Sequence, residues 1–186
     1  MEKVLKTTVL IGSLRKESLT RKVALAMTKL APASLTCEIV EIGDLPLYNE
    51  DLEPNPPAAW TKFRDSVRGT DAVLFVTPEY NRSVPGGLKN AIDVGSRPYG
   101  KSVFGGKAGA VVSVSPGALS GFGANMAVRN SLVFLDVLPM QQPEAYIGHV
   151  KDLLDEHGDL KLEATRTFLT KFMSSFADWT KLIASR

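Results

Sequence analysis

The sequence is poor in the residues that build disulfides, metal centres and acid–base triads. Its 186 residues include one cysteine, Cys37, and two histidines, His149 and His157. A single cysteine excludes an intrachain disulfide and is typical of proteins from a reducing compartment. The histidines lie in a late polar stretch, without metal-ligand spacing or a neighbouring nucleophile. We therefore expect no metal site and no catalytic residue supplied by the protein itself.

Long hydrophobic runs and a strong net charge are missing as well. No run approaches the roughly 18 apolar residues of a membrane span. The N-terminal residues MEKVLKTTVLIGS lack the apolar length and the small-residue cleavage site of a signal peptide. A net charge of +2 gives no basis for binding nucleic acid or an anionic membrane. We expect a cytoplasmic protein with neither kind of partner.

What the sequence does contain is an alternation of apolar, β-branched runs with helically spaced segments. The expected strands are Val4 to Ile11, Leu35 to Ile42, Ala72 to Val76, Ala108 to Val114 and, briefly, Val137 to Met140. Apolar helix faces are formed by Val23, Met27 and Leu30, by Trp60, Phe63 and Val67, by Leu88 to Val94, by Asn125 to Leu135 and by Phe168 to Ile183. With no linker or repeat between these units, residues 1–186 are predicted to form one α/β domain with a doubly wound parallel sheet.

Three of the connecting loops are rich in polar and small residues. They are Gly12 to Thr20 (GSLRKESLT), Thr77 to Gly87 (TPEYNRSVPGG) and Ser115 to Gly123 (SPGALSGFG). Ligands of doubly wound sheets bind beyond the carboxyl ends of the strands, near the point where strand order reverses. In the flavodoxin-like order 2-1-3-4-5 the strands before these loops are adjacent, so we expect the loops to line one cleft.

The first loop has the chemistry of a phosphate site. Ser13, Ser18 and Thr20 offer hydroxyls, and Arg15 offers a fork of guanidinium donors. The following helix adds its unpaired backbone N–H groups. The loop also fits an ordinary N-capped helix in which Ser18 is the cap. In both interpretations the remaining cations face water: Lys16, Arg21 and Lys22. Gly12 is the loop's one glycine, which excludes the dinucleotide fingerprint G-x-G-x-x-G.

The second and third loops suit the edge of a flat heterocycle. Pro78 and Pro85 stiffen the second loop, while Gly86-Gly87 permits close approach of backbone. In the second loop, Glu79, Tyr80 and Asn81 supply polar groups and an aromatic ring. In the third loop, Ser113 to Gly117 supply small side chains and backbone N–H donors. Both loops also fit plain turns before helices.

Residues Gly95 to Ser102 (GSRPYGKS) match the P-loop pattern G-x-x-x-x-G-K-[ST]. That site requires a strand before the loop and a helix after it. Here a helical segment precedes the pattern, and a glycine break leading into a strand follows. The acidic stretch Leu132 to Asp136 continues a helical stripe. A P-loop phosphotransferase is therefore only a minor alternative.

The first two loops together carry a family resemblance. Gly12 to Ser18 (GSLRKES) and Pro78 to Asp93 (PEYNRSVPGGLKNAID) resemble the NADPH-dependent FMN reductases, in particular the chromate and quinone reductases. The resemblance extends from the first strand to Met140. It implies a flavodoxin-like three-layer sandwich with a five-stranded parallel sheet in the order 2-1-3-4-5. It also implies noncovalent FMN, NADPH or NADH as cosubstrate, and a homodimer or homotetramer.

By position, the resemblance assigns residues to the flavin. Around the phosphate it implies Ser13, Arg15 and Ser18, with Leu14 nearby and Thr20 in place of the asparagine of many relatives. Along the ribityl chain and the ring it implies Pro78, Glu79, Tyr80 and Asn81, with Ser115 and Gly117 bordering the ring. Arg82 replaces the tyrosine of some relatives and is expected to tune substrate access or a subunit contact.

The implied activity is electron transfer from NAD(P)H through FMN to a small acceptor, namely a quinone, chromate, an azo compound or free flavin. Such chemistry requires no acid–base triad, which agrees with the scarcity of histidine and cysteine. The rival from another functional class is a flavodoxin-type electron carrier without NAD(P)H activity of its own. Carriers of that kind are usually strongly acidic, and the net charge of +2 argues against one.

Overall fold

Six parallel strands form one sheet in the computed structural model, which describes residues 3–186. The strands are β1 Leu5–Ile11, β2 Leu35–Ile39, β3 Ala72–Thr77, β4 Ala108–Val114, β5 Leu138–Pro139 and β6 Ala145–Ile147. Their order is β2-β1-β3-β4-β5, with β6 also pairing with β4. This order confirms the predicted flavodoxin-like arrangement.

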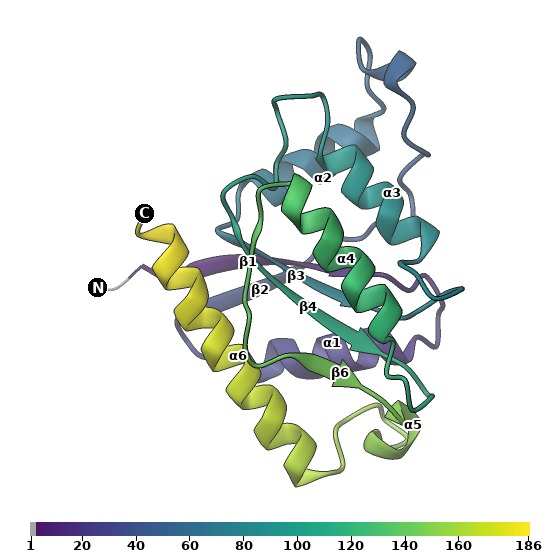
Figure 1. The fold of residues 1–186 in the computed structure, drawn as a ribbon, viewed down its shortest axis with the longest axis vertical. Helices are drawn as coiled ribbons and strands as arrows, with labels where there is room; N and C mark the ends of the chain where they lie inside the picture. The colour runs from purple at the N-terminus through teal and green to yellow at the C-terminus, as the bar shows by residue number, and fades with distance from the viewer. Residues whose placement is uncertain (1–2) are drawn as a thin grey trace.

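Helices cover both faces of the sheet (Figure 1). One face carries α1 Leu19–Lys29 and α6 Glu163–Ala184, and the other carries α2 Ala58–Arg68, α3 Gly86–Gly95 and α4 Phe122–Phe134. Two short helices, η1 Glu50–Leu52 and α5 Val150–Leu153, complete the fold. None of the helices in the described part of the chain has the length and apolar character to cross a membrane.

The central strands are buried on both faces because each contributes side chains to two cores. In β3, Leu74 and Val76 pack against the α1 and α6 side, while Val73 and Phe75 pack against α2, α3 and α4. This alternation follows the two-residue period of a strand. Each fully buried aliphatic or aromatic side chain contributes roughly 1.5–3 kcal/mol of hydrophobic free energy. The two cores therefore fix the carboxyl ends of β1, β3 and β4 side by side.

The edge of the sheet beside β4 differs from the prediction. The sequence predicts one strand over Val137 to Met140, but two short strands fill this position. β5 pairs with the start of β4, and β6 pairs with its end. Pro139 and Pro143 lie within and after β5, and proline has no N–H to donate to a ladder. The expected second strand is also shorter than predicted, because it ends at Ile39 instead of Ile42.

Candidate functional site

A cavity of about 530 Å³ opens at the carboxyl ends of β1, β3 and β4. Its volume lies in the usual range for small-molecule sites, roughly 300–1,000 Å³. The predicted loops do meet there, and a further segment that was not predicted joins them. The lining residues are Ser13, Arg15, Glu17, Leu19, Thr20 and Lys22, then Pro78, Glu79 and Tyr80, then Val114, Ser115 and Pro116, and finally Val150 and Lys151.

Two glycines set the distances between the loops. A Cβ atom on Gly12 would lie 2.9 Å from Thr77 Oγ1 and 3.1 Å from Pro78 Cδ, so only glycine lets the first loop pass this close to the second. A Cβ atom on Gly123 would lie 2.7 Å from the carbonyl oxygen of Arg82. The start of α4 can therefore pack directly against the second loop.

Hydrogen-bond donors without internal partners gather at the start of α1. The Ser18 hydroxyl caps the helix by accepting from Arg21 N at 3.1 Å, as the capping interpretation predicts. The N–H groups of Leu19 and Thr20 find no acceptor within residues 3–186. Ser13 is only 5% exposed, and its hydroxyl also makes no hydrogen bond in that part of the chain. Such a helix terminus, with its partial positive charge, suits an anion.

The cations of this loop differ in their surroundings. Arg15 is exposed, lines the cavity and has no carboxylate partner within residues 3–186, whereas Lys16 lies outside the lining. Arg21 lies outside the lining and forms a surface ion pair, in which its guanidinium donates to both carboxylate oxygens of Glu41, at 2.9 and 2.5 Å. This hydrogen bonding raises the pKa of Arg21. Arg15 is thus the guanidinium of the loop that is left for a ligand.

The second loop is a tight hairpin. Tyr80 and Ser83 exchange backbone hydrogen bonds of 3.1 and 3.0 Å, and the turn between them places Asn81 and Arg82 at φ values of 50° and 63°. Asparagine adopts this left-handed conformation more readily than most residues. The hairpin leaves Pro78, Glu79 and Tyr80 on the cavity wall and carries Asn81 and Arg82 to its tip, outside the lining.

The carboxylate of Glu79 is occupied within the protein. Its Oε2 accepts from the backbone N of Ala124 at 3.0 Å, and its Oε1 accepts from Arg82 Nη1 at 3.1 Å. The N-cap residue of α4 is Gly121, which has no side chain to cap the helix. Glu79 therefore stabilises the start of α4, and its backbone is the part that remains for a ligand.

Other candidate residues support the lining without belonging to it. The Ser115 hydroxyl accepts from Gly117 N at 3.1 Å, so Gly117 stabilises the turn while Ser115 lines the cavity. Leu14 packs over Gly87, where an added Cβ would lie 3.3 Å from Leu14 Cδ1. Of the candidates, those outside the lining are Leu14, Ser18, Asn81, Arg82 and Gly117.

The P-loop pattern has the wrong surroundings for a phosphate site. α3 runs into the pattern and ends at Gly95, and the next regular element is the strand β4. Residues 132–134 of the supposed acidic strand belong to α4. This is the reverse of the strand–loop–helix order that the mechanism needs.

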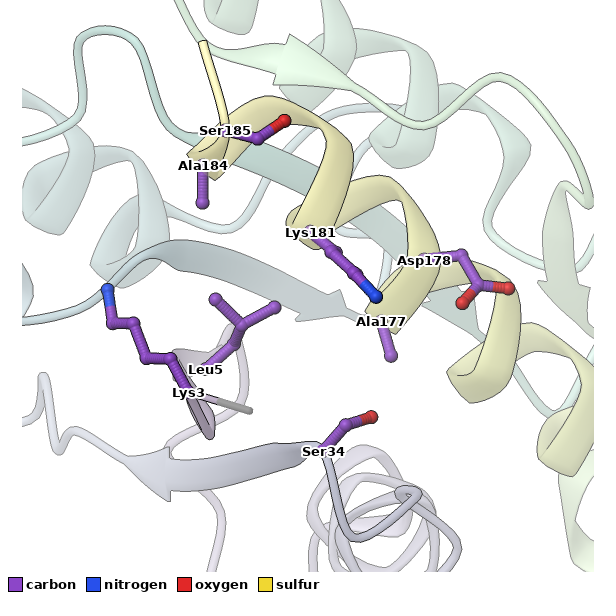
Figure 2. Close-up of a pocket in the computed structure, with 8 residues that line it drawn as sticks. All are labelled: Lys3, Leu5, Ser34, Ala177, Asp178, Lys181, Ala184 and Ser185. Carbon is purple, nitrogen blue, oxygen red and sulfur yellow. The ribbon is translucent and has the colours of Figure 1, made fainter. Parts of the chain in front are cut away.

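A second cavity, of about 350 Å³, lies at the opposite end of β1. Figure 2 shows its wall, formed by Lys3 and Leu5 at the start of β1, by Ser34 and by side chains of the last turns of α6. Lys3 Nζ donates to Asp71 Oδ1 at 2.7 Å. None of the candidate residues lines this cavity.

Comparison with known proteins identifies the family. A family profile described as NADPH-dependent FMN reductase matches residues 5–152. The chain belongs to this family. It is 64% identical over 183 residues to a quinone reductase of Pseudomonas putida, a match that covers 98% of each chain. It is 42% identical to a 2-hydroxy-1,4-benzoquinone reductase of Burkholderia sp, covering 95% of this chain and 97% of that one.

A solved structure agrees with this assignment. The flavoenzyme NAD(P)H:(acceptor) oxidoreductase FerB of Paracoccus denitrificans superposes with a TM-score of 0.90 at 40% identity, covering 96% of this chain and 98% of that one. As a member of the family, the protein is an oxidoreductase that uses FMN and a nicotinamide cosubstrate. The residues present fit FMN, since the unpartnered donors at the start of α1 suit a phosphate and the adjoining cavity has the volume for a small molecule.

Proposed function

We propose that the protein is an FMN-dependent NAD(P)H oxidoreductase that reduces quinones. The observation that carries this proposal is the cavity at the carboxyl edge of the sheet, with the N–H groups at the start of α1 at one end and Tyr80 and Ser115 on its walls. The near full-length similarity to proteins named quinone reductases supports the choice of acceptor. Chromate, azo compounds and free flavin are further candidate acceptors.

The flavin contacts that we propose follow from the places of the side chains. Ser13, Arg15 and Thr20 hold the phosphate, together with the N–H groups that the Ser18 cap leaves free. Leu14 keeps this loop packed against the start of α3. The ribityl chain and the ring are held by Pro78, by the backbone of Glu79, by Tyr80 and Asn81 of the hairpin, and by Ser115 with Gly117. Arg82, at the hairpin tip, is placed to affect substrate access.

When bound, FMN would supply the redox chemistry, the transfer of electrons from NAD(P)H to the acceptor. The chain itself binds and orients the flavin. Gly12 and Gly123 allow the first loop and the start of α4 to pack directly against the second loop. This close packing fixes the wall that contains Pro78, Tyr80 and Ser115. Tyr80 is about half exposed on this wall.

The test is spectroscopic and kinetic. The purified protein is expected to be yellow or to take up added FMN, to bleach with NADPH without oxygen, and to reduce quinones with a higher kcat/KM than chromate, azo dyes or free flavin. A protein that binds FMN but is not bleached by NADPH or NADH would be the electron carrier instead. A protein that binds no FMN would contradict the proposal.

We further propose that the protein is a cytoplasmic homo-oligomer, a dimer or a tetramer, assembled through α4. This helix exposes apolar side chains on the side away from the core. They are Phe122, Met126, Val133 and Phe134. Large exposed apolar side chains gathered on one helix are typical of protein interfaces. A second copy of this chain is the occupant we propose for it.

A further inference from the structure

The cavity has a fourth wall that lies outside the three loops. It is formed by α5, which follows β6 at the carboxyl edge of the sheet, on the side of α1 (Figure 1). Val150 is fully buried in the core beside α1, and the next residue, Lys151, lines the cavity. A cation therefore faces the same space as Arg15 and the free N–H groups of α1.

The backbone that carries Lys151 is fixed against the third loop. Toward the third loop, Ser115 N donates to Ile147 O at 2.8 Å, and Val150 N donates to Ser115 O at 3.2 Å. Seven and eight residues further along, the chain meets α1: a Cβ on Gly158 would lie 2.8 Å from Lys22 Cδ, and Lys29 Nζ donates to Asp159 Oδ1 at 3.1 Å. Lys151 is thus held beside the third loop by backbone contacts that do not involve its own side chain.

The charges that line the cavity leave two cations without a partner. The carboxylate of Glu79 is bonded to Ala124 N and Arg82. Glu17 lies 3.4 Å from Lys22 Nζ. Arg15 and Lys151 have no ion-pair partner within residues 3–186. A phosphate monoester carries a charge of about −1.5 to −2 at neutral pH, so one guanidinium neutralises only part of it.

We propose that Lys151 binds the FMN phosphate together with Arg15 and slows release of the flavin. The inference deepens the proposed function and rests on its placing of the phosphate at α1. Arg15 supplies a fixed fork of donors, and Lys151 supplies a point charge on a flexible stem that reaches the phosphate from the opposite wall.

The experiment compares flavins with and without the phosphate. Flavin-free Lys151→Gln protein is titrated with FMN and with riboflavin, following flavin fluorescence, and the dissociation rate is measured by dilution. We expect the Kd for FMN to rise about tenfold, mostly through faster release, as for the loss of one charged contact. The Kd for riboflavin should be unchanged. Lys151→Arg should restore FMN binding, and Lys161→Gln, at an exposed position outside the cavity lining, should leave it unchanged.

Three results would overturn the inference. Equal weakening of FMN and riboflavin would mean that Lys151 only supports packing of the segment. Unchanged FMN affinity with a raised KM for NADPH would assign Lys151 to the phosphates of the nicotinamide cosubstrate. Unchanged FMN affinity with an unchanged KM would leave it without a role in binding. Wild-type protein that failed to bind FMN would contradict the proposed function itself, a result distinct from these three.

Discussion

Two neighbouring cations of the first loop, Arg15 and Lys16, differ in whether their side chains line the cavity. Both are exposed side chains in the first loop, yet Arg15 lines the cavity and Lys16 does not. The composition of the loop shows that cations are present. Their difference becomes visible only when the start of α1, the cavity and the Arg21–Glu41 pair are placed in space.

Arg15→Ala should weaken FMN binding by about 10- to 100-fold, because it removes a charged donor from the phosphate. Lys16→Ala is the matched control and should change the Kd by less than about twofold, the usual range for an exposed charge without a close partner. The measurement is fluorescence titration of the flavin-free proteins at constant ionic strength. Equal losses in the two variants would show that the phosphate is bound elsewhere.

The burial of Cys37 predicts that the stability of the protein depends on pH. Burial raises the pKa of its thiol from 9.0 to about 11. Since the folded pKa lies above the unfolded one, the thiol's contribution to stability is complete below pH 9 and is lost between about pH 9 and 11. Two pKa units correspond to about 2.7 kcal/mol, the upper limit for this loss.

The measurement is urea unfolding of wild-type and Cys37→Ala proteins across this pH range. The quantity compared is the difference between their free energies of unfolding. Their stability difference should be constant below pH 9 and should shift in favour of Cys37→Ala above it. The thiol should also react slowly with alkylating reagents at pH 8 until urea is added. A difference that stays constant up to pH 11 would contradict the burial effect.

Among the secondary-structure elements, α4 depends on a residue from another loop. Its N-cap glycine has no side chain, and Glu79 supplies the missing acceptor from the hairpin after β3. This contact joins the second and third walls of the cavity. It was not predictable from the sequence, where Glu79 stands 45 positions before Ala124 and shows only the features of a ligand-binding loop.

Glu79→Gln should therefore destabilise the protein by about 1 kcal/mol, through loss of a negative charge at a helix N-terminus. Arg82→Gln removes the other partner of the ion pair. It should cost less than about 0.5 kcal/mol, because Arg82 is largely exposed and such pairs contribute little. Urea unfolding of both variants tests this contrast. Similar losses would mean that the ion pair, rather than the capping of α4, is what stabilises the loop.

The strands and helices differ in how far the sequence could predict them. β3 and β4 are continuous apolar runs covered on both faces, and a run such as AVLFV has few alternatives to a central strand. β6 and α5 are three and four residues long, too short for a periodic pattern to show. Their formation depends on β4 and on the buried Val150, which are tertiary contacts. For this reason the fourth wall of the site was missed, although the loops of the other three were found.

For the molecule as a whole, the two cores leave different outer surfaces. On the face covered by α1 and α6, the small cavity of Figure 2 lies at the amino end of β1, beside the last turns of α6. The other face ends in α4, whose outer side is apolar next to the hairpin of the functional site. An assembly through α4 would therefore place two sites near one interface.

The substitution pair Val133→Lys and Phe134→Lys should dissociate the oligomer. The two side chains are 78% and 70% exposed in the single chain, so lysine costs little there unless a second copy covers them. The measurement is molar mass by light scattering during size-exclusion chromatography. Leu182→Lys, at a 53% exposed position on α6, is the matched control and should keep the wild-type mass. FMN binding by the α4 variant should persist, which would show that the chain is still folded. A folded α4 variant with the mass of the wild-type oligomer would exclude α4 as the interface.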